Sequence, residues 1–134
     1  MANENIKLNF LHLCDYASFG EGGKLNILGI FKKINITKFP ATHPQLFIVA
    51  NVIVTKPGSY KEIIKIIDDE NNNIIKPLEF NLTFPSGRKE KQAEFGVVAQ
   101  VNNLSLSKEG NHRVQIYINK QLIGEAILTV SKSK

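Results

Sequence analysis

A length of 134 residues predicts a single domain, residues 1–134, that can bury a core without disulfide staples. The lone cysteine, Cys14, excludes an intramolecular disulfide and a Cys-x-x-Cys metal or redox site, and it fits a reducing compartment. A formal net charge of +5 favours loose attraction to anionic polymers or surfaces without defining a particular one.

Targeting and membrane signals are the next feature to consider. The first residues, Met-Ala-Asn-Glu-Asn, are not a basic region followed by an apolar core, and the longest apolar runs are far shorter than a membrane span. We therefore expect a cytoplasmic protein with no membrane partner. We also expect residues 1–5 and 131–134 to be mobile tails.

The apolar segments are short, rich in β-branched residues and bounded by Gly, Pro, Asn or Asp, and none keeps a helical period over twelve residues. This pattern predicts an all-β chain. The expected strands span residues 6–16, 24–36, 45–55, 60–68, 74–84, 92–101, 113–118 and 122–130. Seven or eight strands at this spacing favour a single-domain antiparallel β-sandwich, immunoglobulin-like or jelly-roll-like.

The first two strands are expected to form a hairpin around a glycine cluster. Gly20, Gly22 and Gly23 can adopt the positive φ angles of a tight reversal, and bulky residues flank them on both sides. Within the second strand, Gly29 indicates a bulge or the close approach of another backbone.

The middle of the chain contains its most hydrophobic run, residues 45–55, which predicts a central strand covered on both faces. The prolines of the preceding Phe39-Pro-Ala-Thr-His-Pro44 segment predict a crossover loop between sheets, because proline cannot donate to a β-ladder.

Alternation along the later strands predicts which side chains face outward. On residues 60–68, Ile63 and Ile67 lie opposite the expected core face, and Ile123 and Ile127 do the same on the last strand. These residues predict outward apolar patches. Farther along the chain, Leu104 and Leu106 are expected in a connecting loop, and Asn119-Lys120 in a two-residue hairpin turn.

Three segments resemble a family of small bacterial proteins of unknown function. They are the run Leu13-Cys-Asp-Tyr-Ala17, the turn and strand Glu21-Gly-Gly-Lys-Leu-Asn-Ile-Leu-Gly-Ile-Phe31, and Phe39-Pro-Ala-Thr-His-Pro44. The resemblance extends over most of the chain. It implies a free-standing cytoplasmic β-sandwich and supplies no activity.

Two sets of residues could carry chemistry. His12 and Cys14 share one side of a strand, but a metal site would need His43 or His112 as well, and the apolar neighbours of Cys14 argue against a nucleophile. The acidic run Asp68-Asp-Glu70 could bind calcium, yet it lacks the spacing of an EF-hand loop and is typical of a solvated hairpin tip. We find no catalytic motif and expect no catalytic residue, cofactor or metal.

A ligand or partner loop is the remaining possibility for a site. Binding residues tend to lie on loops held by a rigid scaffold, so we place it between the Glu21, Gly22 and Gly23 turn and His43. The alternative is that the prolines on either side of His43 merely fix the crossover.

Two classes of function follow. The first is a non-enzymatic binding or assembly module that pairs with another protein or with itself, as a homodimer, through a sheet face or an edge strand. The alternative is a weak binder of nucleic acid or another polyanion through the basic segments 32–33, 88–91 and 131–134, which could equally be a solvated surface. A metal-dependent or hydrolytic enzyme has the fewest residues in its favour.

Overall fold

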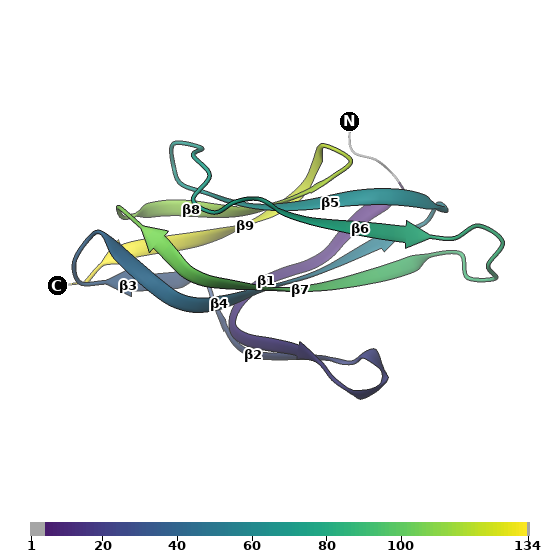
Figure 1. Cartoon of the computed structure of the whole chain (residues 1–134), viewed down its shortest axis with the longest axis horizontal. Helices are drawn as coiled ribbons and strands as arrows, with labels where there is room; N and C mark the ends of the chain where they lie inside the picture. Colours follow the sequence, from purple (N-terminus) through teal and green to yellow (C-terminus); the bar gives the residue numbers. More distant parts are fainter. Residues whose placement is uncertain (1–4, 134) are drawn as a thin grey trace.

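The structure, a computed structural model, describes residues 5–133 and is all-β, as the sequence predicts (Figure 1). Nine strands form two sheets in this part of the chain, and one turn of 3-10 helix, η1 (Glu21–Gly23), joins the first two strands. The strands are β1 (Ile6–Phe19), β2 (Leu25–Phe31), β3 (Lys33–Ile36), β4 (Ala41–Val54), β5 (Gly58–Ile67), β6 (Leu78–Phe84), β7 (Ala93–Leu106), β8 (Gly110–Ile118) and β9 (Gln121–Lys132).

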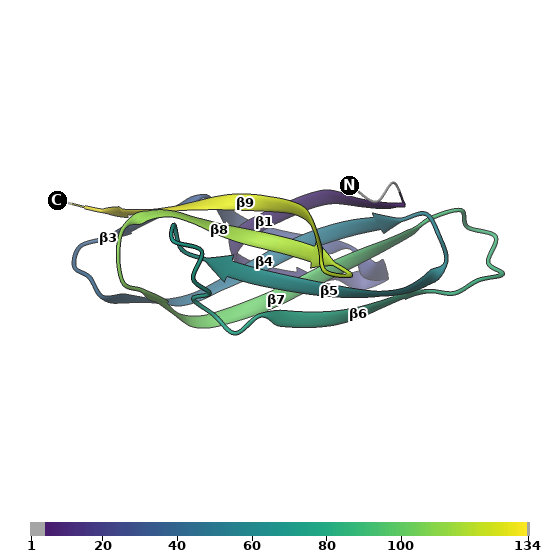
Figure 2. The ribbon, with the colours of Figure 1, turned by 90° about the horizontal axis from the view of Figure 1, so that it is seen from above.

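The first sheet has the strand order β2-β1-β4-β7, and the second, which curls, has the order β3-β9-β8-β5-β6 (Figures 1 and 2). One buried cluster receives side chains from both sheets, so the sheets share a core. Alternate residues supply it, such as Leu46 and Ile48 of β4 and Val114 and Ile116 of β8, because successive side chains of a strand point to opposite faces. Residues 5–133 contain no helix with the length and hydropathy of a membrane span.

The β1–β2 hairpin forms one edge of the first sheet and bends over the outer face of β4, and Figure 1 shows β2 beneath β1, β4 and β7. We call residues 15–31 the hairpin arm. Its Ala17 and Ile27 join Phe47 and Val49 of β4 in a separate buried cluster. The run Leu46–Ala50 is therefore buried throughout, which confirms the prediction of a central strand covered on both faces for this part of residues 45–55, whereas Asn51 and Ile53 are half-buried.

The predicted strand 24–36 is two strands, because the chain crosses between sheets at Lys32. β2 pairs with β1 in the first sheet, whereas β3 pairs with β9 in the second. The β3–β9 pair is parallel, so the prediction of a wholly antiparallel fold is wrong at this position, and the described residues contain nine strands rather than seven or eight.

The expected crossover between sheets is present at residues 37–40, which join β3 of the second sheet to β4 of the first, but the prediction that it includes His43 is wrong, because Ala41–Pro44 belongs to β4. The β1 ladder of β4 reaches only to Phe47, so Pro44 lies where β4 has a neighbour on one side alone and a missing N–H costs little. That neighbour is β7, whose Leu104 pairs with His43, so Leu104 and Leu106 lie in a strand and not in a connecting loop.

The isoleucines that were predicted to face outward differ in how far they are buried. Ile127 is 52% exposed, but Ile67 is buried. A register shift between β8 and β9 leaves Ile123 without a partner on β8, between the paired residues Leu122 and Gly124. Because this bulge adds one residue, the side chains of β9 on its two sides no longer alternate in step. Ile123 consequently packs against the core. Asn119 and Lys120 form the expected two-residue turn, both with positive φ.

The chain ends are described in part. Ser131 and Lys132, expected in a tail, belong to β9, where they pair with Asn35 and Ile36. Residues 1–4 and Lys134 lie outside the described residues.

Glu62 is a buried carboxyl group in the second sheet. It is 0% exposed, its cross-strand neighbours are Phe80 and Ile118, and neither of its carboxyl oxygens has a hydrogen-bond partner in the described part of the chain. Removal from water disfavours the charged form and raises the pKa of Glu62 from 4.5 to about 7.

This carboxyl group predicts a pH-dependent stability. Because the folded chain holds the proton more tightly, the contribution of Glu62 is fully present below pH 4.5 and is lost as the pH rises through 7, at a cost of about 3 kcal/mol. Urea unfolding at pH 5 and pH 8 should show that Glu62→Gln is closer to wild type at pH 5 and more stable than wild type at pH 8. An identical pH dependence in both proteins would contradict the assignment.

Candidate interaction surface

One side of the molecule has two half-paired strand edges facing one another. β2 pairs with β1 only from Leu13 to Phe19, and β3 pairs with β9 only from Thr129 to Lys132. Residues 6–12 of β1 and residues 121–128 of β9 therefore have no strand on that side within the described part of the chain. We call the space between these two edges the seam.

The seam is closed at both ends. At one end, Leu8 of β1 lies so close to Gly124 of β9 that a Cβ atom there would be 2.3 Å from the leucine side chain. At the other end the chain crosses between sheets, and the N–H of Thr129 donates a hydrogen bond of 2.9 Å to the carbonyl of Lys32.

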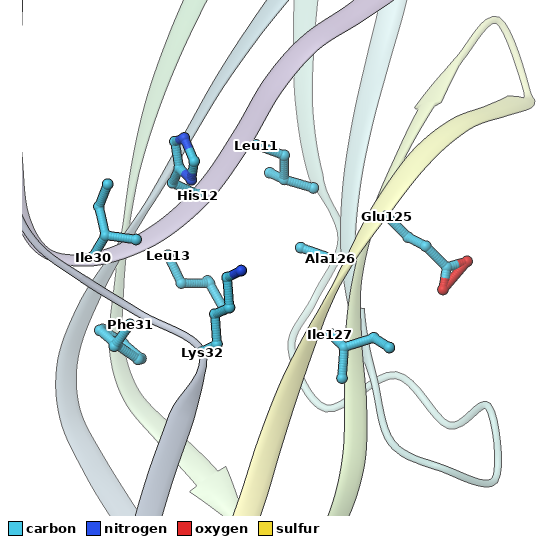
Figure 3. Close-up of a pocket in the computed structure, with 9 residues that line it drawn as sticks. All are labelled: Leu11, His12, Leu13, Ile30, Phe31, Lys32, Glu125, Ala126 and Ile127. Carbon is cyan, nitrogen blue, oxygen red and sulfur yellow. The ribbon is translucent and has the colours of Figure 1, made fainter.

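A cleft of about 420 Å³ lies between these ends (Figure 3). It is lined by Leu11, His12, Leu13, Ile30, Phe31, Lys32, Glu125, Ala126 and Ile127. Leu11 and Ala126 project into the gap from β1 and β9 (Figure 3). The volume is within the range of ordinary ligand pockets, and most of the lining side chains are apolar.

The two charged residues that line the cleft, Lys32 and Glu125, differ in whether they form an ion pair. The Lys32 ammonium extends into the gap between β1 and β9, whereas Glu125 points away from it (Figure 3). Glu125 lies 3.9 Å from Arg113, and none of the ion pairs in residues 5–133 includes Lys32. The cleft thus combines apolar walls with one uncompensated positive charge.

Exposed apolar side chains continue from the cleft onto the hairpin arm. Ile30 is 52% exposed, Leu28 63% and Tyr16 48%, and Leu28 pairs directly with Tyr16 across the hairpin. Ile127, on the opposite wall of the cleft, is also exposed. We call Tyr16, Leu28, Ile30 and Ile127 the apolar strip. Contiguous exposed apolar surface of this kind marks interaction sites.

The structure does not bring the predicted loop residues together. Glu21, Gly22 and Gly23 form the tip of the hairpin arm, where both glycines have positive φ. His43 lies at the opposite end of β2, with its ring 6.0 Å from that of Phe31, in a separate small cleft that Asp15 and Lys33 also line.

His12 and Cys14 have different surroundings. His12 stacks on Phe10 at 5.6 Å and lines the seam. Cys14 is fully buried, and its Sγ lies 3.5 Å from the Tyr16 carbonyl and 3.7 Å from that of Phe47. Burial raises the pKa of the Cys14 thiol, which lowers its reactivity. Residues 5–133 contain no cluster of three His, Cys, Asp or Glu side chains able to hold a metal.

The acidic run after β5, Asp68–Glu70, forms hydrogen bonds and ion pairs with other residues of the chain. Asp68 accepts hydrogen bonds of 2.9 Å from the N–H groups of Glu70 and Asn72, and these bonds lower its pKa. Lys108 forms ion pairs with both Asp69 and Glu70. An ammonium group is thus already paired with two of the three carboxylates that a calcium ion would need.

The seam itself was not predicted from the sequence. The outward facing of Ile127 and the basic Lys32-Lys33 pair were visible signals, but nothing local indicates that β1 and β9, the first and last of the described strands, face one another across a cleft. Pairing between distant strands depends on the whole topology rather than on the pattern of one segment.

The fold and the seam define a small all-β protein with two sheets and an open, apolar edge. Residues 9–131 match the family described as "Family of unknown function (DUF6941)", and the chain belongs to that family, which confirms the expected membership of a family of unknown function. No curated protein matches the chain.

Among solved structures, the chain is similar to the Pseudomonas fluorescens alkylpurine DNA glycosylase AlkC bound to DNA containing an abasic site analog. The TM-score is 0.52 at 12% sequence identity, and the match covers 95% of this chain but only 30% of the glycosylase. At this identity the likeness concerns the fold alone.

The burial of Cys14 predicts slow thiol chemistry. We expect an aromatic disulfide reagent to modify Cys14 in the folded protein at least about a hundredfold more slowly than in urea, because the folded state exposes no thiolate. The absorbance of the released thiolate gives both rates. Comparable rates would show that Cys14 is accessible.

Proposed function

We propose that this protein is a non-enzymatic binding or assembly module that holds another protein chain through the apolar strip. The observation that carries the proposal is the exposure of Tyr16, Leu28, Ile30 and Ile127 beside two unpaired strand edges. Tyrosine is enriched among the residues that dominate the binding energy of protein interfaces, and apolar side chains form the buried centre of such interfaces.

The groups that could serve catalysis are occupied in ways that support a binding role. The Cys14 thiol is buried with a raised pKa, Asp68 accepts backbone hydrogen bonds, and Lys108 forms ion pairs with Asp69 and Glu70. We therefore propose that the protein acts by contact and not by chemistry.

We also propose that the chain is a single β-sandwich domain that works in the cytoplasm. The shared core of the two sheets supports the first part, and the free Cys14 in a chain without a second cysteine supports the second. The partner is either a different protein or a second copy of the chain.

Replacing Leu28 with Lys tests the apolar strip. Leu28→Lys should weaken partner capture or self-association roughly tenfold or more, because a charged group would replace a desolvated apolar one. Light scattering after size exclusion measures self-association, and a pull-down from native lysate measures capture.

A matched control is Leu122→Lys, since Leu122 is 42% exposed near the turn between β8 and β9, lies beyond Gly124, where Leu8 closes the seam, and is outside both the cleft and the apolar strip. It should leave both readouts unchanged. A monomer that captures nothing, or equal loss in both variants, would exclude the apolar strip as the binding surface.

Nucleic-acid binding is a second candidate, favoured by two observations. Lys33 and Lys132 both belong to the short parallel β3–β9 ladder, where they pair with Thr129 and Ile36, and the fold resembles part of a DNA glycosylase solved with DNA. Residues 88–91 lie at the opposite end, in the loop between β6 and β7, so the basic residues form two separate groups (Figure 1).

Retention on heparin or DNA distinguishes this candidate. A Lys33→Glu, Lys132→Glu double variant should elute at lower salt than wild type, whereas a Lys89→Glu, Lys91→Glu variant of the opposite end should change retention less, because released counterions scale with neutralised phosphates. Wild type that is not retained at low salt would end the candidate.

A further inference from the structure

The unpaired half of β9 directs backbone groups into the seam. The N–H of Thr129 donates to the Lys32 carbonyl and that of Ser133 to the Ile36 carbonyl, so odd-numbered residues of β9 point their backbone groups toward β3. The β8–β9 register is unbroken from Val130 to Gly124. Because backbone groups alternate between the two sides of a strand, those of Glu125 and Ile127 point into the seam.

The seam has the length of a short extended peptide. The distance from Gly124, where Leu8 closes the seam, to Thr129, where the crossing chain closes it, is five residues, or about 16 Å at the rise of a strand. A segment of four or five extended residues would continue the line of β3 along β9. It would satisfy the free N–H and C=O groups of Glu125 and Ile127.

The walls of the cleft indicate which side chains such a peptide carries. Leu11, Leu13 and Ala126 offer apolar surface to the residues that point inward. The Lys32 ammonium lies in the gap (Figure 3) and forms no ion pair within residues 5–133, while Glu125 lies 3.9 Å from Arg113. An acidic side chain at one position of the peptide would complete the charge pairing.

The other free edge beside the apolar strip is a poorer template. Gly29, in the middle of β2, has a φ of +70°, and the side chain of its neighbour Asp15 lies against it. A strand kinked at its centre and bordered by a carboxylate does not offer a continuous ladder. This favours β9 over β2 as the pairing edge.

We propose that the seam binds an extended segment of a partner protein as an additional strand on β9, with apolar residues inward and an acidic residue beside Lys32. This inference rests on the proposed function and specifies its mode. The main-chain hydrogen bonds would provide affinity, and the cleft and Lys32 would provide selectivity.

Selection from a displayed library of random ten-residue peptides on the full folded chain tests the mode. Enriched peptides should alternate apolar and polar residues and contain at least one Asp or Glu. A synthetic enriched peptide should slow amide exchange of Glu125 and Ile127 at least tenfold. Lys32→Glu should lower the affinity for that peptide tenfold or more, and a selection repeated on this variant should enrich basic peptides.

Ile127→Pro probes the backbone contact. The N–H that proline removes faces the seam and not β8, so the variant should keep its melting temperature within a few degrees and lose peptide affinity tenfold or more. Ile127→Val keeps the N–H and should bind nearly as wild type. If Ile127→Pro does not fold, amide exchange in the wild-type complex decides.

The outcomes separate this inference from the proposed function. Peptides that protect only the hairpin arm, that bind as helices, or that are indifferent to Lys32→Glu would overturn strand addition. Failure to enrich any peptide would do the same. The pull-down with Leu28→Lys then judges the apolar strip independently, since Leu28 does not line the seam cleft.

Discussion

The crossing of the chain from the first sheet to the second at Lys32 determines much of this architecture. One hydrogen bond, from the Thr129 N–H to the Lys32 carbonyl, marks the point where β2 ends and β3 begins alongside β9. Because β2 covers only the end of β1 and β3 only the end of β9, a single crossing leaves both strands half-paired. The seam is a direct result of where that crossing lies.

The hairpin arm provides a second organising contact, on the outer face of the first sheet. Ala17 and Ile27 cover Phe47 and Val49, so Leu46–Ala50 in the middle of β4 is buried on both faces although its sheet has only four strands. The same fold-back leaves Leu28 and Ile30 in solvent, because the two faces of the arm cannot both be covered. The position of the hairpin arm over β4 thus explains both the burial of Ala17 and Ile27 and the exposure of Leu28 and Ile30.

The sequence predicted what depends on local pattern. Alternation located most strands, the glycines near residue 22 located the hairpin, and the continuous apolar run identified the central strand. The sequence did not predict the parallel β3–β9 pair or the inclusion of Pro44 in β4. Both depend on which distant strands lie next to β3 and β4. In the candidate site, the sequence correctly predicted that Ile127 faces outward. It did not predict the cleft, because the residues of β1, β2 and β9 that line it are far apart in the sequence and share no local pattern.

The parallel pair also has a consequence for synthesis of the chain. β3 cannot pair until β9 has been synthesised, because the ladder joins Lys33 to Thr129, far apart in the sequence. Contacts between such distant residues form slowly. A chain synthesised only as far as β8 lacks one wall of the seam, so this surface forms only after β9 has been made.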